Sequence, residues 1–190
     1  MFEETRVKLL AAARAHFGEH GYADTSMDDL TASVGLTRGA LYHHFGGKNG
    51  LLAAVVDTLD AELDAELNRL SAAEPDPLVA LEKRCRADLE VSARPDIQRI
   101  LFQDAPAVLG RTVDADHSHC VESMSALIER AQAEGMVAAE VEPRSLAVLI
   151  NGALIDASRW IATTPAPENA RRQDETLTAV SVLIRALRLK

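Results

Sequence analysis

The apolar residues of this 190-residue chain recur every three or four positions, which is the spacing of helices and not of strands. Leu10, Ala13 and Phe17 form one such face over residues 2–20, and Gly21 is the predicted C-terminal stop of that helix. The same pattern predicts further helices over about 26–34, 37–44, 48–70, 77–93, 96–110, 114–135, 145–162 and 168–187. Because strand-like alternation is missing and Ala and Leu dominate, we expect an all-α fold of about nine helices.

Several residues mark where these helices start or bend. Ser26 is followed three residues later by Asp29, a capping-box arrangement, although Glu or Gln is the usual partner. Thr37 can cap the third helix, and Pro106 predicts a kink within 96–110. Residues 145–162 are apolar almost all round, so we expect this helix to be buried on several sides.

Composition narrows the class of protein. Hydrophobic residues make up 47% of the chain, yet no uninterrupted apolar run reaches the ~18 residues that span a bilayer. The N-terminus is charged and lacks a signal-peptide core, and Cys85 and Cys120 make no disulfide framework. These features predict a cytoplasmic protein without a membrane partner.

Enzymatic motifs are missing from the sequence. Gly46-Gly47-Lys48 lacks the glycine spacing and the following Ser or Thr of a phosphate-binding loop. Neither G-x-S-x-G nor H-E-x-x-H occurs. We therefore expect no catalytic residues, no cofactor and no resident metal.

The stretch from Ser26 to Leu52 reads as a short helix, a glycine-containing turn, a second short helix and then a long helix. Two short helices joined by a tight turn form a helix-turn-helix, whose second helix enters the DNA major groove. The candidate DNA-binding residues are Ser26, Thr37, Arg38, Gly39, Tyr42, His43 and Lys48.

Each of these residues has a chemical use at a DNA surface. Arg38 can donate two hydrogen bonds to guanine, Thr37 offers a hydroxyl, and Gly39 lets the helix approach closely. Tyr42 offers a phenol to phosphate and a ring to thymine methyl groups, and His43 adds a donor. Lys48 opens the long helix, where its ammonium and the backbone N–H groups can hold a phosphate. Ser26 is a helix cap first and a phosphate contact second. The alternative for these side chains is a solvated helix face.

The run from Gly21 to Leu52 resembles the DNA-binding domain of the TetR family of repressors. The resemblance covers about the first 55 residues and is densest in Gly39-Ala40-Leu41-Tyr42-His43-His44-Phe45 followed by Lys48. The chain departs from the family pattern at Gly46-Gly47 and Asn49-Gly50, which predicts a looser start of the long helix. A weaker resemblance to a C-terminal subtype of the family covers 97–101 and 104–110.

The resemblance implies a DNA-binding domain over 1–47 and a ligand-binding and dimerisation domain over 48–190. It further implies a homodimer on double-stranded, pseudo-palindromic operator DNA, released by a small-molecule effector that moves the helix over 48–70. A repressor is the expected role. The alternative is a helical ligand-binding or adaptor protein that no longer binds DNA.

The same resemblance places an effector pocket and a dimer interface in the C-terminal part. The candidate pocket residues are Leu63, Cys85, Leu89, Ile100, Phe102, Met124, Leu127 and Trp160, each of which could equally be plain core. The candidate interface residues are Leu149, Gly152, Ala153, Asp156, Leu177, Val180, Ile184 and Leu187. The last four follow a 3-4-3 spacing that suits either an intrachain core or a seam between two chains.

The segment Asp114–Cys120 concentrates residue types that bind metals, but its spacing matches no standard zinc site. On a helix His117 and His119 would point about 200° apart, which favours a polar helix start over a metal site.

The net charge of −9 argues against a protein coated in basic surface for nucleic acid. The acidity is uneven, however, since residues 1–50 hold 5 basic and 6 acidic side chains and the remainder carries −8. DNA contact is therefore expected to be confined to one small face around Arg38, His43 and Lys48.

Overall fold

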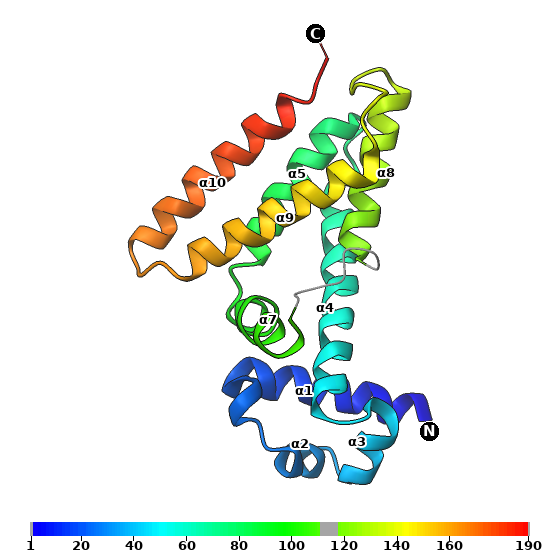
Figure 1. Ribbon diagram of the computed structural model, residues 1–190, viewed down its shortest axis with the longest axis vertical. Helices are drawn as coiled ribbons and strands as arrows, with labels where there is room; N and C mark the ends of the chain where they lie inside the picture. Colours follow the sequence, from blue (N-terminus) through cyan, green and yellow to red (C-terminus); the bar gives the residue numbers. More distant parts are fainter. Residues whose placement is uncertain (1, 111–117, 190) are drawn as a thin grey trace. The chain divides into compact units, whose positions relative to one another are not determined.

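The computed structural model describes residues 2–110 and 118–189, and within these residues it contains helices and no strand (Figure 1). The elements are α1 (Phe2–Asp24), α2 (Met27–Ser33), α3 (Arg38–Phe45), α4 (Lys48–Ser71), α5 (Pro77–Val91), α6 (Pro95–Ile97), the π-helical η1 (Gln98–Asp104), α7 (Ala105–Leu109), α8 (His119–Ala133), α9 (Pro143–Ala162) and α10 (Glu168–Arg185). Because α6, η1 and α7 follow one another without a break, the described residues form nine continuous helical segments. The expected all-α fold is confirmed.

The described chain divides into two compact units. The first contains residues 2–59 and 94–110, and the second contains residues 60–93 and 118–189. Helix α4 begins in the first unit and ends in the second. Among the described residues, the chain therefore crosses between the units once inside α4 and once between α5 and α6.

The core of the first unit forms around α1. Leu9, Ala13 and Phe17 are fully buried on its inner face, together with Leu30 of α2 and Leu41 of α3. The start of each short helix is capped as the sequence predicts. The hydroxyls of Ser26 and Thr37 each accept a backbone N–H three residues on, at 3.2 Å. Local capping and a shared apolar face thus fix the helix-turn-helix.

Gly21 breaks α1 where the sequence predicts the stop, and one further turn follows to Asp24. Its φ of 82° lies in the left-handed region that favours glycine. A Cβ there would also lie 3.3 Å from Nε of Arg99. We therefore expect no other residue to fit this position without strain.

The segment over α6, η1 and α7 packs on α1 and completes the first unit. Asp96 pairs with Arg14 at 3.2 Å, Arg99 donates to the carbonyl of Glu19 at 2.7 Å, and Asp104 accepts the backbone N–H of Tyr22 at 2.8 Å. Asp104 also ends the π-helical stretch, which precedes Pro106.

The predicted kink near Pro106 takes the form of this π-helical stretch. A proline has no N–H to donate to residue 102, which an α-helix would use as its acceptor. One residue earlier, the N–H of Ala105 donates to the carbonyl of Ile100, the longer spacing of a π-helix. The wider turn therefore lies directly before the proline.

The second unit is a helical bundle with its own core. Buried side chains from α4, α5, α8, α9 and α10 form one apolar cluster, with Leu81, Met124, Ile150 and Ile184 among its members. The helix starts are capped by Asp76, Ser118 and Glu142, each through a side-chain oxygen. Pro143 stands in the first turn of α9, as the sequence predicts.

Helix α9 departs from the expectation that it is buried on several sides. Leu149 is 71% exposed and Trp160 is 49% exposed, and Val148 is exposed as well. By length and mean hydropathy, α9 is the one helix of the described chain that could cross a membrane. This is weak evidence for such a role, because the helix carries Asp156 and Arg159 and core helices pass the same test.

Candidate functional site

The outer face of the helix-turn-helix carries the polar residues that the sequence singles out. Thr37, Arg38, Gly39 and His43 are exposed, and Tyr42 is exposed to 54% although it is an aromatic residue. All five lie in the cap and body of α3. The structure thus gathers them on one solvent-facing helix, as a DNA-reading helix requires.

Arg38 is paired with Asp28 across the turn between α2 and α3. Its Nη1 lies 3.3 Å from Oδ2 of Asp28, and both side chains are more than half exposed. Exposed pairs of this kind contribute about 0–1 kcal/mol. Breaking the pair between Arg38 and Asp28 therefore costs little free energy.

Lys48 is held against the end of α1. Its Nζ lies 4.5 Å from the centre of the Tyr22 ring and donates to the carbonyl of Ala23 at 3.3 Å. Partial burial lowers the pKa of Lys48, while Asp24 and Asp104 act in the opposite direction. The Tyr22 hydroxyl in turn donates to Asn49. Sequence reasoning missed Tyr22 as the partner of Lys48, although Gly21-Tyr22 belongs to the resembling motif.

The start of α4 is closely packed, which contradicts the expectation that the glycines loosen it. A Cβ at Gly50 would lie 1.9 Å from the carbonyl oxygen of Phe45. Only glycine allows α4 to approach the end of α3 this closely. Gly50 therefore fixes the position of Lys48 relative to α3.

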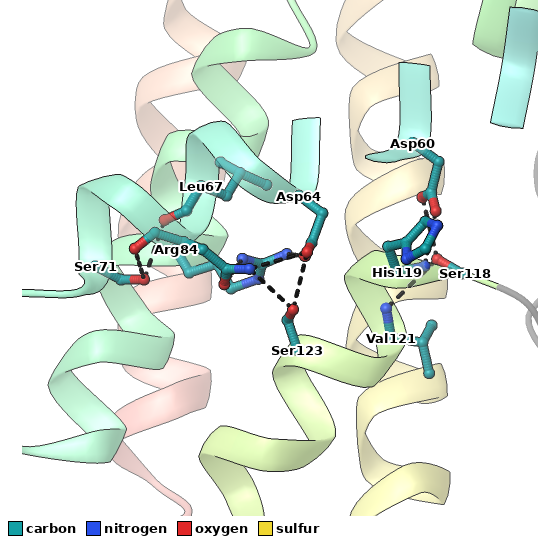
Figure 2. Close-up of polar contacts among 10 residues, drawn as sticks. Asp60, Asp64, Leu67, Ser71, Arg84, Ser118, His119, Val121 and Ser123 are labelled. Atoms are coloured by element: carbon teal, nitrogen blue, oxygen red, sulfur yellow. Dashed lines mark hydrogen bonds and ion pairs between the residues drawn. The ribbon is translucent and has the colours of Figure 1, made fainter. Parts of the chain in front are cut away.

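The second unit contains a polar network around a buried arginine that the sequence analysis did not predict (Figure 2). The side chain of Arg84 on α5 is 1% exposed, forms an ion pair with Asp64 on α4, and donates to Oδ1 of Asn68 at 2.8 Å. Asp64 also accepts a hydrogen bond from Ser123 on α8 at 3.0 Å. The network thus joins three helices at one point.

One turn earlier on α4, Asp60 accepts two hydrogen bonds from the start of α8 (Figure 2). The donors are the hydroxyl of Ser118 at 3.2 Å and the backbone N–H of His119 at 2.7 Å. Burial raises the pKa of Asp60, and these hydrogen bonds partly oppose it. A helix start is a favourable place for this carboxylate because its N–H groups carry partial positive charge.

Asp88 and the two cysteines lie close to this network. Burial raises the pKa of Asp88 to about 6, and Asp60 adds to the rise, while Arg84 and Ser92 oppose it. Burial also raises the pKa of Cys85 to about 12 and raises that of Cys120. Both thiols are therefore protonated near neutral pH and behave as small apolar groups.

The predicted pocket residues fall into three groups. Cys85, Leu89 and Met124 belong to the apolar cluster of the second unit, and Leu127 packs against it; Leu63 is buried. Ile100 and Phe102 lie in η1, which belongs to the first unit, so the structure does not place them in one cluster with the others.

Trp160 is the exception among the predicted pocket residues. It stands near the end of α9, about half exposed, and its ring lies 4.4 Å from the guanidinium carbon of Arg172. Within the described chain it is therefore a surface side chain covered on one face by an arginine.

The predicted interface residues divide between an outer face and the core. On α9, Leu149, Gly152, Ala153 and Asp156 are exposed. On α10, by contrast, Ile184 is fully buried in the apolar cluster of its own chain. Leu177, Val180 and Leu187 are half-buried and pack against the same cluster. For Ile184 the intrachain alternative is therefore correct, because its side chain has no surface left for a partner.

A shallow apolar groove of about 170 Å³ runs between α9 and α10. It is lined by Ile150, Ala153, Leu154, Ala157, Thr176, Ala179, Val180 and Leu183. Val182 and Leu183 are at least half exposed, and periodicity alone did not mark them as surface residues.

The structure describes only part of the Asp114–Cys120 segment, whose residue types can bind metals. Asp114, Asp116 and His117 lie outside the described residues, and Cys120 is buried at the start of α8. Among the residues described, no group of three or more His, Cys, Asp or Glu side chains is arranged to hold an ion.

Two family models match the chain. The model for bacterial regulatory proteins of the tetR family matches residues 9–55, and that for a tetracyclin repressor-like C-terminal domain matches residues 78–187. The first match contains α2, α3 and Lys48, and the second contains more than half of the chain.

Several known proteins are similar to this chain. A TetR-family transcriptional regulator of Pectobacterium atrosepticum, known from its crystal structure, is 50% identical with a TM-score of 0.86, over 100% of this chain and 96% of that one. The regulator TtgR of Pseudomonas putida is 39% identical over 83 residues, or 43% of this chain and 39% of TtgR. The repressor BepR of Brucella suis is 33% identical over 102 residues, or 52% of this chain and 48% of BepR.

The matches to these two curated regulators thus cover less than half of their length. The C-terminal family model, by contrast, covers most of this chain's second half. Helix α3 lies within the residues that the N-terminal family model matches. The chain belongs to the TetR family of transcriptional regulators.

Proposed function

We propose that this protein is a homodimeric, cytoplasmic repressor that binds a pseudo-palindromic operator through α3 and is released by a small-molecule effector. The observation that carries the proposal is the exposed polar face of α3, whose start is capped by the side chain of Thr37. In this proposal residues 1–47 read DNA, and residues 48–190 bind the effector and form the dimer.

The exposed apolar face of α9 and α10 supports the dimer. Leu149, Val182 and Leu183 are large apolar side chains at the surface, beside a groove that exposes little polar area. Monomeric soluble proteins rarely leave such contiguous patches in water. Two helices from each chain would cover this face in a four-helix interface.

Release by an effector follows from linkage between the two sites. A dimer must place its two α3 helices in successive major grooves, about one helical turn or a multiple apart. An effector that binds more tightly to a dimer with wrongly spaced α3 helices lowers the affinity of the protein for its operator. By reciprocity, bound operator lowers the affinity for the effector by the same factor. Helix α4 connects the two units covalently and is the segment expected to move.

A binding experiment tests the regulatory role. We expect the full-length protein to shift duplex DNA from upstream of its own gene at moderate salt, and to shift a random duplex of equal length far less. Equal binding to both duplexes would contradict a sequence-specific regulator. Binding to neither would support the alternative of a helical adaptor or ligand-binding protein that no longer binds DNA. A control titration at high salt measures the sequence-independent part.

Lys48→Ala and Arg38→Ala should separate phosphate contact from base reading. Without Lys48, binding to all sequences should weaken alike, and the salt slope should flatten by about one unit. Without Arg38, base preference should relax by about 1–3 kcal/mol. The measurement is operator affinity across base variants and salt concentrations. Circular dichroism serves as the control, because Lys48 also contacts Tyr22. Identical behaviour of the two variants would contradict these roles.

Leu149→Lys should dissociate the dimer while the fold of each chain persists. A lysine at this exposed position leaves the monomer unstrained but buries a charge in the proposed interface, which is unfavourable. We expect the dimer dissociation constant to rise by about a hundredfold or more, measured by analytical ultracentrifugation. Leu70→Lys, at an exposed position on α4, is the matched control and should leave the dimer intact.

A further inference from the structure

We infer that the second unit carries a separate binding site for a small organic anion with a carboxylate head group, in a surface pocket between α5 and α10. The pocket has a volume of about 410 Å³, within the usual range for small-molecule sites. It is lined by Leu78, Val79, Glu82, Lys83, Arg86, Arg185 and Arg188.

The pocket concentrates positive charge on an acidic protein. Four of its seven lining residues are cationic and one is acidic, whereas the whole chain has a net charge of −9. The cations come from two segments about a hundred residues apart in the sequence. Lys83 and Arg86 lie on α5. Arg185 is the last residue of α10, and Arg188 follows it. The fold, and not local composition, brings them together.

Three of the four cations have carboxylate partners. Lys83 pairs with Glu74, Arg188 pairs with Asp76, and Arg185 forms two hydrogen bonds to Glu82 at 2.8 and 2.9 Å. The hydrogen bonds from Arg185 hold the pKa of Glu82 below its usual value, so Glu82 is ionised and its charge is offset by Arg185.

Arg86 differs from the other three cations. Its Nη1 donates to the carbonyl of Leu177 at 2.9 Å and to the hydroxyl of Ser181 at 3.1 Å, and both acceptors are neutral. These bonds orient the guanidinium, which also attracts the carboxylate of Glu82. Glu74, Asp76 and Glu82 together offset three of the four cationic charges, which leaves one positive charge in excess, shared by Arg86 and Arg185 around Glu82.

The ligand class follows from this charge and from the apolar residues that line the same pocket. A planar guanidinium matches a carboxylate in geometry, and charge-assisted hydrogen bonds of this kind are the strong ones. Leu78 and Val79 on α5 supply apolar surface for the body of the ligand. A single excess charge matches a monoanion, so a small monocarboxylic acid fits better than a multiply charged phosphate ester.

This site is distinct from the proposed dimer face. Ser181, Arg185 and Arg188 present one side of α10 toward α5, whereas Ala179 and Leu183 line the groove toward α9. A dimer built on the groove therefore leaves the anion pocket accessible.

Isothermal titration of the full-length protein without DNA tests the inference, with hexanoate and benzoate as probes at low salt. We expect saturable binding of both acids, weaker binding of inorganic phosphate, and no binding of hexylammonium. Arg86→Met should weaken hexanoate binding by about tenfold or more. Arg69→Met, at an exposed arginine on α4, should leave it unchanged.

Arg86 also joins α5 to α10, so a second variant guards against simple unfolding. Val79→Glu adds a negative charge to the pocket wall at a half-buried position in the first turn of α5, where an acidic residue favours the helix. Val79→Glu should abolish carboxylate binding. Absence of saturable binding to the wild-type protein, or equal binding by the wild type and Val79→Glu, would overturn the inference. The latter outcome would place the acid elsewhere in the molecule.

Discussion

Replacing Arg84 with methionine is expected to destabilise the protein by about 3–5 kcal/mol, the usual cost of breaking a buried ion pair from one side. Methionine keeps much of the length of the side chain, so the loss comes mainly from charge and hydrogen bonding. The variant leaves Asp64, which is half-buried where α4 meets α5 and α8, without its ion-pair partner. Urea unfolding monitored by circular dichroism measures the change in free energy.

A double variant separates the pair interaction from packing. Asp64→Leu combined with Arg84→Met removes both charges, and apolar replacements of buried pairs are often nearly neutral. We therefore expect the double variant to be more stable than Arg84→Met alone. Arg130→Met, at an exposed arginine on α8, should change stability by less than about 0.5 kcal/mol. A double variant less stable than Arg84→Met would show that the stabilisation comes from the polar contacts themselves.

Asp88→Asn is expected to stabilise the protein at pH 7.5 by about 1–3 kcal/mol and to change little at pH 4. The pKa of Asp88 is raised to about 6 in the folded state, against about 3.9 for an unperturbed aspartate. The folded state therefore binds the proton more tightly than the unfolded chain does. Ionisation consequently costs folding free energy, progressively between about pH 4 and pH 7.

The amide of asparagine removes the charge without changing the shape of the side chain. Its oxygen can still accept the hydrogen bond from Ser92, while the attraction to Arg84 and the repulsion from Asp60 are both lost. The test is the free energy of unfolding as a function of pH for both proteins. Asp57→Asn, on the exposed face of α4, is the control. Parallel stability curves for the wild type and Asp88→Asn would contradict the raised pKa.

Features set by neighbours in sequence could be predicted from the sequence. The caps at Ser26 and Thr37, the break at Gly21 and the proline start of α9 depend on a few adjacent residues, and each lies where it was predicted. Helix α3 was predictable for the same reason, since its motif is short and contiguous.

Features set by distant partners could not be predicted. The 3-4-3 spacing from Leu177 to Leu187 indicates that one face is covered, but it does not identify the residues that cover it. The structure shows that Ile184 packs against its own chain. In the sequence, Arg84 cannot be distinguished from the other arginines of predicted helices. Its ion pair with Asp64 depends on the packing of α5 against α4. The apolar composition of α9 likewise predicted burial, whereas the described chain leaves Leu149 exposed. Periodicity identifies a buried or apolar face, but the partner of that face is a property of the tertiary fold.

The contacts of residues 94–110 with α1 have a consequence for engineering. Asp96, Arg99 and Asp104 supply bonds to Arg14, Glu19 and Tyr22, and all three lie far outside the N-terminal family domain. A DNA-binding module cut after residue 55 would lose these partners and leave the break at Gly21 uncovered. Chimeric regulators built by exchanging the first 55 residues would therefore join mismatched surfaces. A functional exchange would need to carry the segment 94–110 along, as a two-piece cassette.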